Sequence, residues 1–271
     1  MHRRAASMVV LLGLAQRAEA SSSSELLRNK TGENDRYSGI GRLQLSGSCT
    51  AFFIKTPGAA GPAYALTAAH CYSLSSQDVF VDRAASSPVT FQFFTDTQDR
   101  QVKAAVRRVA YSTMKGTDIA LLELDVTQAE LVARGVRPLE LEATEPARAG
   151  DRVEAVGAPG LFFDIEERFL RRSRCQILNE RVDLLEFRWN FRNSQASDCE
   201  DIVGGISGSP LIAGKSGQSS RNRQHHHPPG LDERRRRRLL SWPSLRVAGR
   251  RAAGRGRDQL FNTGAGIARV F

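Results

Sequence analysis

The chain is dominated between residues 39 and 213 by short apolar segments, each bounded by glycine, proline or small polar residues. Several of them alternate apolar and polar side chains, which is the pattern of half-buried β-strands. Only residues 127–133 are compatible with one short helix. Many short strands in a chain of 271 residues indicate an all-β protein, either barrels or a sandwich. The expected strands are 40–45, 50–55, 64–67, 79–81, 89–94, 102–111 and 119–124, then 153–156, 174–178, 184–189, 210–213 and 266–270.

The net charge of +10 is confined to one segment, residues 214–258. This segment holds Lys215 and twelve arginines against three acids, so the rest of the chain is neutral. The basicity therefore does not indicate a domain that binds nucleic acid or a membrane. The segment lacks apolar periodicity, and we expect a low-complexity basic insert that is not folded. His225 to His227 are interpreted as part of this polar run, and no metal site is predicted.

The N-terminus has the features of a signal peptide over residues 1–20. A positive start precedes a short apolar run, and Ala18-Glu-Ala20 matches a cleavage site. No other segment is long and apolar enough to cross a bilayer, so a secreted, extracellular protein is predicted. Residues 21–38 are serine-rich and then charged, and we expect a flexible lead-in or a propeptide there.

Four cysteines follow the predicted cleavage site: Cys49, Cys71, Cys175 and Cys199. An even number in an exported chain indicates disulfides, and three pairings are possible. Local pairing would place one disulfide in each half of the chain. The spacing does not resemble a zinc site.

Three short motifs contain the residues that acyl transfer at a serine requires, which are a base, an orienting carboxylate and a nucleophile near amide donors. His70 lies in Leu66-Thr-Ala-Ala-His-Cys71, Asp118 in Gly116-Thr-Asp-Ile-Ala120, and Ser207 in Gly204-Gly-Ile-Ser-Gly-Ser-Pro210. Taken singly, each has an ordinary alternative: a buried histidine beside a disulfide, an aspartate that caps a turn, and a Gly/Ser loop.

Taken together, in the order His, Asp, Ser, the motifs resemble those of the trypsin and chymotrypsin-like serine peptidases, over about residues 39–213. The resemblance implies two packed six-stranded Greek-key barrels, the first over about 39–135 and the second over about 150–271. It implies His70 as general base, Asp118 as its orienting partner and Ser207 as nucleophile, with the amides of Gly205 and Ser207 as oxyanion hole. A monomer that acts on proteins or peptides without a cofactor or metal is then expected.

A narrower resemblance is to the glutamyl-endopeptidase-like branch, which has G-x-S-G-S-P around the serine. Cys199-Glu-Asp201 occupies the place of a block typical of that branch, and Cys175 resembles its disulfide partner. Ile206 stands where animal trypsins have the aspartate that receives the new N-terminus, so activation of that kind is not expected. Asp201 falls at the place of the trypsin pocket aspartate in an ungapped match, which would favour Arg or Lys substrates. The glutamyl-like register would instead make it an ordinary loop acid.

The C-terminal region departs from the family. Two strands that wall the specificity pocket should follow the serine, but the basic insert intervenes before residues 266–270, which resemble a late family strand. This leaves open whether the second barrel is complete. The alternative function is therefore a catalytically inactive peptidase homologue that acts as a binding or regulatory module.

Overall fold

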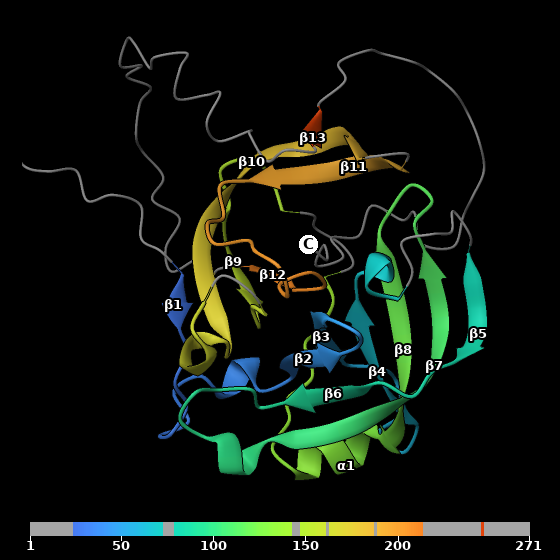
Figure 1. Cartoon of the computed structure of the whole chain (residues 1–271), viewed down its shortest axis with the longest axis vertical. Helices are drawn as coiled ribbons and strands as arrows, with labels where there is room; N and C mark the ends of the chain where they lie inside the picture. Colours follow the sequence, from blue (N-terminus) through green and yellow to red (C-terminus); the bar gives the residue numbers. More distant parts are fainter. Residues whose placement is uncertain are drawn as a thin grey trace, which may run out of the picture.

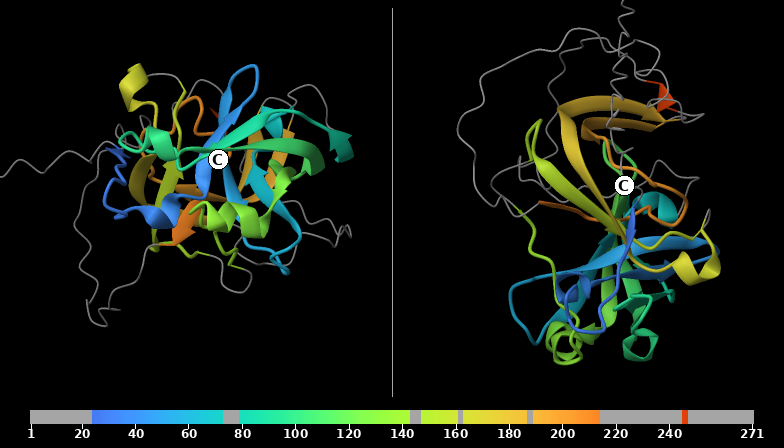
Figure 2. Two further views of the ribbon diagram at one scale, coloured as in Figure 1. Left: turned by 90° about the horizontal axis from the view of Figure 1, so that it is seen from below. Right: turned by 90° about the vertical axis from the view of Figure 1, so that its left-hand side faces the viewer.

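A computed structural model describes residues 24–72, 79–142, 147–160, 163–186, 189–213 and 245–246 (Figure 1). The predicted signal peptide, the predicted strand 266–270 and all but two residues of the basic insert lie outside these ranges. The described chain forms a seven-stranded sheet and a six-stranded sheet. Figure 2 shows the second sheet stacked above the first, so that the predicted all-β architecture is confirmed.

The first sheet closes on itself. Its strands follow the order β5-β7-β6-β2-β3-β4-β8, and β8 pairs back onto β7, which makes a closed six-stranded barrel. Strand β5 is additional and pairs with β7. Closure removes the exposed edges that an open sheet would leave. The strands are β2 (Ile40–Gln44), β3 (Ser48–Ile54), β4 (Pro62–Thr67), β5 (Phe80–Ala84), β6 (Pro88–Phe91), β7 (Val102–Thr113) and β8 (Ile119–Thr127).

Strand β3 is buried on both faces because it separates two cores. Successive side chains on a strand point to opposite faces. Phe53 therefore lies in the barrel interior with Phe91 and Leu122, while its neighbour Phe52 packs between the barrel and the second sheet. All four side chains are fully buried. The run of apolar residues in this segment thus joins the two halves of the fold.

The one α-helix among the described residues, α1 (Gln128–Ala133), follows β8 directly, as the sequence predicts. Thr127 and Glu130 form a capping box, in which each side chain bonds the backbone N–H of the other residue. Leu131 is fully buried and anchors the helix against the barrel. Short 3-10 helices are η1 (Asp35–Tyr37), η2 (Ala69–Cys71), η3 (Gln98–Arg100) and η4 (Ile165–Glu167).

The second sheet is open within the described residues. Its main path is β1-β10-β9-β12, and β11 and β13 both pair with β10. Strand β13 is the one described part of the predicted basic insert. The bounds are β1 (Glu25–Leu26), β9 (Arg152–Gly157), β10 (Arg171–Glu186), β11 (Trp189–Ser197), β12 (Leu211–Ala213) and β13 (Leu245–Arg246).

The hairpin of β10 and β11 reaches across to the first barrel, as Figure 1 shows. Trp189 and Phe191 are buried in the barrel's core cluster. Phe191 forms an isolated parallel bridge with Gly116, and the Arg192 N–H donates to the Gly116 carbonyl over 2.9 Å. The hairpin therefore contacts the turn that precedes Asp118.

Residues 24–38 contribute strand β1 to the second sheet and two side chains to the core between the two sheets. Strand β1 pairs antiparallel with β10, and both Leu27 and Tyr37 are fully buried. The expectation of a flexible lead-in over 21–38 is thus corrected for residues 24–38. The serine-rich and charged composition indicates flexibility, but the buried side chains of Leu27 and Tyr37 anchor this segment.

Both disulfides follow the local pairing, Cys49 with Cys71 and Cys175 with Cys199. The first connects β3 to η2, and the second connects β10 to the loop that leads to Ser207. Among the described residues, no helix is long and apolar enough to span a membrane.

Candidate active site

His70 and Asp118 are joined by two contacts. The His70 side chain follows β4 on the short helix η2, and Asp118 directly precedes β8. The His70 backbone N–H donates to Asp118 Oδ1 over 3.0 Å, and His70 Nδ1 lies 2.5 Å from Asp118 Oδ2. A carboxylate is only an acceptor, so Nδ1 carries the proton and Nε2 is left as the basic nitrogen. Strands β4 and β8 are hydrogen-bonded neighbours, which brings the two residues together.

The environment raises the pKa of His70. Burial of the imidazole lowers this pKa, but the hydrogen bond and charge of Asp118 outweigh it, and the charge of Glu186 adds to them. The side chain keeps 29 % of its surface exposed and that of Asp118 keeps 18 %. The imidazole is thus stabilised in its protonated form while one edge remains open to solvent.

Thr50 holds the Ser207 loop onto the first barrel. Its backbone N–H donates to the Ser207 carbonyl over 2.7 Å, and its hydroxyl donates to the Gly205 carbonyl over 2.9 Å. The same hydroxyl accepts the Ala158 N–H over 2.9 Å. Thr50 is fully buried on β3. Sequence reasoning missed this residue, although a polar side chain inside an otherwise apolar strand was a signal for a buried hydrogen-bonding role.

Two glycines in this loop are required by its shape. Gly205 has φ +100° and a Cβ there would lie 2.1 Å from the Gly160 nitrogen. Gly208 has φ +91° and a Cβ there would lie 2.1 Å from the Thr50 carbonyl oxygen. Any other residue would be strained and would clash with backbone. Among the described residues, the N–H groups of Gly205 and Ser207 have no hydrogen-bond acceptor.

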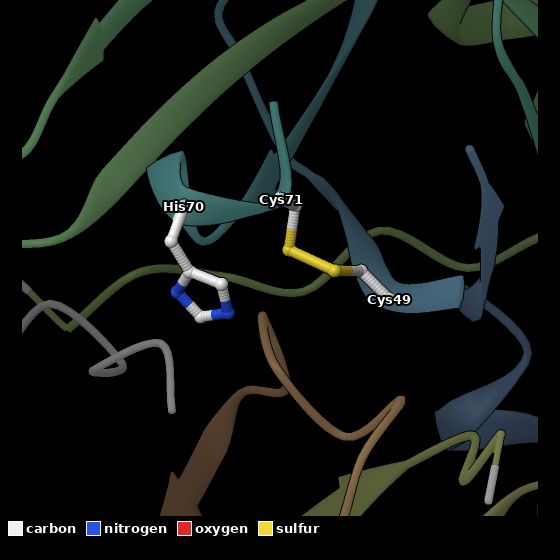
Figure 3. Close-up of side chains that lie close together, drawn as sticks. All are labelled: Cys49, His70 and Cys71. Carbon is white, nitrogen blue, oxygen red and sulfur yellow. A yellow bond between two sulfur atoms is a disulfide. The ribbon is translucent and has the colours of Figure 1, made fainter. Parts of the chain in front are cut away.

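Ser207 lies beside the residue that follows His70. The Cys71 Sγ is 4.0 Å from the Ser207 carbonyl oxygen, and Figure 3 shows the segment before β12 passing close to the imidazole ring. Ser207 is half-buried between the buried residues Ile206 and Gly208. Among the hydrogen bonds of the described residues, none joins its hydroxyl to His70. Such a bond often tightens only when substrate binds.

Residues 49–218 match the family of the trypsin-like peptidase domain. The chain belongs to this family. The match begins at the first cysteine of the disulfide beside His70, and it includes all three predicted catalytic residues.

Solved structures similar to this trypsin-like domain include other proteases. A thermostable serine protease from an extremophilic microorganism is 13 % identical, with 66 % of this chain and 80 % of that chain covered and a TM-score of 0.43. The MamO protease domain from Magnetospirillum magneticum is 13 % identical, with 65 % and 79 % covered and a TM-score of 0.46. Rv3671c from M. tuberculosis H37Rv, in an inactive mutant form, is 18 % identical, with 72 % and 78 % covered and a TM-score of 0.41. No curated protein matches the sequence.

Asp201 of the trypsin-like domain binds the N-terminal segment. Its Oδ2 accepts the Ser24 N–H over 2.6 Å and the Ser24 hydroxyl over 2.8 Å. Asp201 also has a φ of +55°, which is uncommon for a residue with a side chain. The predicted specificity residue thus has partners within its own chain. Ile206 is buried, as suits an apolar residue at its position.

The ligand-type atoms of Cys49, His70 and Cys71 lie within 4.8 Å of one another. Figure 3 shows these three side chains close together. Both sulfurs belong to one disulfide, so neither is a thiolate that could bind a metal ion. This cluster is therefore explained by the disulfide next to the histidine. His225 to His227 lie outside the described residues.

Proposed function

We propose that this trypsin-like domain is a secreted serine endopeptidase with His70, Asp118 and Ser207 as its catalytic triad. The observation that carries the proposal is the two-point contact of Asp118 with His70, at 3.0 Å to the backbone and 2.5 Å to the ring. A carboxylate that binds both the backbone and the ring of one histidine fixes the tautomer and the orientation that a general base needs.

In the acylation step, the Ser207 oxygen attacks the carbonyl carbon of the scissile bond. Its proton passes to His70 Nε2, and the charge that forms on the ring is stabilised by Asp118. The carbonyl oxygen becomes an oxyanion, for which the N–H groups of Gly205 and Ser207 are the donors we assign. Their lack of an acceptor among the described residues supports this role.

Acylation is completed when the tetrahedral intermediate collapses and the carbon–nitrogen bond breaks. The leaving amine takes the proton from His70, which leaves an acyl ester on Ser207. Water then enters, gives its proton to the same nitrogen and attacks the ester, and the regenerated serine recovers a proton when the acid product leaves. The exposed edge of the imidazole is compatible with this use by an amine and then by water.

The finer placement of the enzyme is also a proposal. The G-x-S-G-S-P loop and the disulfide of Cys175 with Cys199 support the glutamyl-endopeptidase-like branch. Two disulfides and the absence of a membrane-spanning helix among the described residues are compatible with an extracellular protein. We expect a monomer that cleaves proteins or peptides.

A fluorophosphonate probe, which reacts covalently with an activated serine, tests the assignment. The full chain should be labelled at Ser207, and Ser207→Ala should lose both labelling and peptide hydrolysis. Ser46→Ala is the matched control, because Ser46 is exposed in the turn between β2 and β3, and it should label like the natural chain. If the folded natural chain is labelled no faster than Ser207→Ala, the proposed peptidase activity is rejected and the chain is an inactive homologue.

A further inference from the structure

Ser24 is one of the most buried polar residues near the start of the described chain, with 4 % of its surface exposed. Its backbone N–H and its hydroxyl both donate to the same oxygen of Asp201, over 2.6 and 2.8 Å. The two residues are 177 positions apart in sequence. A half-buried carboxylate that receives two donors is well satisfied, and such charge-assisted bonds are stronger than neutral ones.

Arg171 binds the same serine through its guanidinium group. Its Nε donates to the Ser24 hydroxyl oxygen over 2.8 Å, and its Nη2 donates to the Ser24 carbonyl over 2.5 Å. Arg171 is itself buried and lies over the ring of Phe163. Ser24 therefore bridges a buried cation and a carboxylate, and all of its polar groups have a partner.

The residues that follow extend this attachment. Glu25 pairs with Arg172 over 2.5 Å and with Arg174 over 3.1 Å, both on β10. The N–H of the fully buried Leu27 donates to the Leu170 carbonyl over 2.8 Å. The N-terminal segment, residues 24–27, is thus fixed along its whole length.

The other partner, Asp201, belongs to the loop that carries the proposed oxyanion donors and nucleophile. We call residues 198–210, between β11 and β12, the nucleophile loop. It contains no strand or helix, so its shape depends on the contacts that hold it. Thr50 holds its second half. Its first half is held by the disulfide at Cys199, by a bond from the Glu200 N–H to Ser173 Oγ over 2.9 Å, and by Ser24.

We propose that Ser24 and Arg171 are positioning residues for the peptidase, which act through Asp201 to hold the nucleophile loop in its active shape. This rests on the proposed function. The role of Asp201 is to receive the N-terminal segment, in place of a cationic substrate side chain. The left-handed backbone at Asp201 supports this, because a strained residue needs fixed contacts to persist.

The test uses the full chain and the variants Ser24→Ala, Asp201→Asn and their combination. Ser24→Thr retains the hydroxyl and serves as the rescue variant. Thr31→Ala is the matched control, because the Thr31 hydroxyl bonds only Glu33 in its own turn. Two measurements are made, the rate of fluorophosphonate labelling at Ser207 and the hydrogen exchange of backbone amides in the nucleophile loop.

Ser24→Ala and Asp201→Asn should each slow labelling by roughly 10- to 100-fold, the effect of losing one buried charge-assisted bond. The double variant should be no slower than the worse single one, because both changes weaken the same Ser24–Asp201 contact. Amides of the nucleophile loop should exchange faster in these variants, and Ser24→Thr should behave like the natural chain.

The peptide substrate separates the two roles of Asp201. Peptides with Lys, Glu or Leu before the scissile bond should lose kcat/KM to a similar degree in Asp201→Asn, mainly through kcat. A loss confined to the Lys peptide, with Ser24→Ala unaffected, would overturn the proposal and make Asp201 a receptor for cations. If the natural chain is never labelled, the proposed function fails, and loop exchange alone then decides the inference: unchanged exchange in Ser24→Ala rejects it.

Discussion

Thr50 and Ser207 are bonded across the boundary between the two sheets, from the Thr50 N–H to the Ser207 carbonyl over 2.7 Å. The Thr50 hydroxyl adds a bond to Gly205, two residues earlier. Strand β3 of the first barrel therefore fixes the position of Ser207. The disulfide of Cys49 and Cys71 connects the same strand to η2, the short helix that contains His70.

Replacing Thr50 with Val should impair both stability and catalysis. Valine has the same shape but leaves the Gly205 carbonyl and the Ala158 N–H without their buried partner, at a cost of about 1–3 kcal/mol. We expect a lower urea midpoint and slower labelling of Ser207. Thr50→Ser retains the hydroxyl and should recover most of both. Equal behaviour of the valine and serine variants would contradict the role of the hydroxyl.

Asp118→Asn should leave the fold intact and reduce kcat on the order of 10⁴-fold. An amide can place an N–H against Nδ1, which favours the wrong tautomer and leaves Nε2 protonated. The pKa of His70 should fall, because its hydrogen bond to a charged group and that charge both raise it. Steady-state kinetics and an NMR titration of the imidazole in the Ser207→Ala background check the two effects. A variant with normal kcat would remove Asp118 from the mechanism.

The pH dependence of kcat/KM should have an acid limb at a pH above 6.5, the ordinary pKa of histidine. The imidazole of His70 must be neutral to act as a base, and its pKa is raised. Activity should therefore increase as the pH increases through the raised pKa of His70. Glu186→Gln should move the limb to lower pH because it removes one negative charge that favours the imidazolium. Glu180→Gln, an exposed change on the same strand β10, should leave the limb in place.

The raised pKa of His70 also predicts that the free energy of unfolding depends on pH. A pKa raised in the folded state means that protonated His70 stabilises the fold fully below about pH 6.5, and this contribution is lost as pH rises through the folded pKa. The unfolding free energy of the natural chain should therefore decrease over this range relative to that of His70→Gln. Parallel curves for the two chains would show that the histidine is not linked to folding.

Removing the disulfide of Cys175 and Cys199, by alanine at both positions, should cost about 3 kcal/mol, the usual value for a loop of this size. The pair spans 24 residues and anchors the first half of the nucleophile loop. The matched pair, Cys49 and Cys71, spans 22 residues, so its removal should cost a similar free energy. Thermal unfolding of both double variants checks this, and a much smaller loss in either would contradict the common loop-closure origin.

The sequence predicts the barrel well because its strands are rich in buried apolar residues, and because those of β7 alternate in part with more exposed ones. The bounds of β7 and β8 fall within a few residues of the expected ones, and the helix after Thr127 has a complete capping box. The prediction of two separate strands at 174–178 and 184–189 is wrong, because one continuous strand, β10, runs through both segments up to Glu186. Strand β11 is not predicted from the sequence, because most of its side chains after Phe191 are polar and at least partly exposed. They therefore show no alternation of apolar and polar residues.

The pairing of His70 with Asp118 was predictable, because each belongs to a motif whose chemistry requires the other. The roles of Thr50 and Ser24 were not. Thr50 bonds backbone groups and Ser24 bonds side chains, in both cases of residues far away in sequence, and no local pattern in a strand or a serine run encodes such partners. The packing of residues 24–38 depends on Leu27 and Tyr37, two apolar residues spaced too widely to give a periodicity.

The burial of Trp189 and Phe191, which come from the second sheet, within the core of the first barrel has a consequence for how the protein unfolds. Neither half retains a complete interior if the other is lost, so the halves are not interchangeable modules. We expect a single cooperative transition, in which the change in tryptophan emission and the loss of β-structure by circular dichroism coincide. A protease that opened one half would therefore disrupt both, and the domain would be either wholly folded or wholly open to digestion.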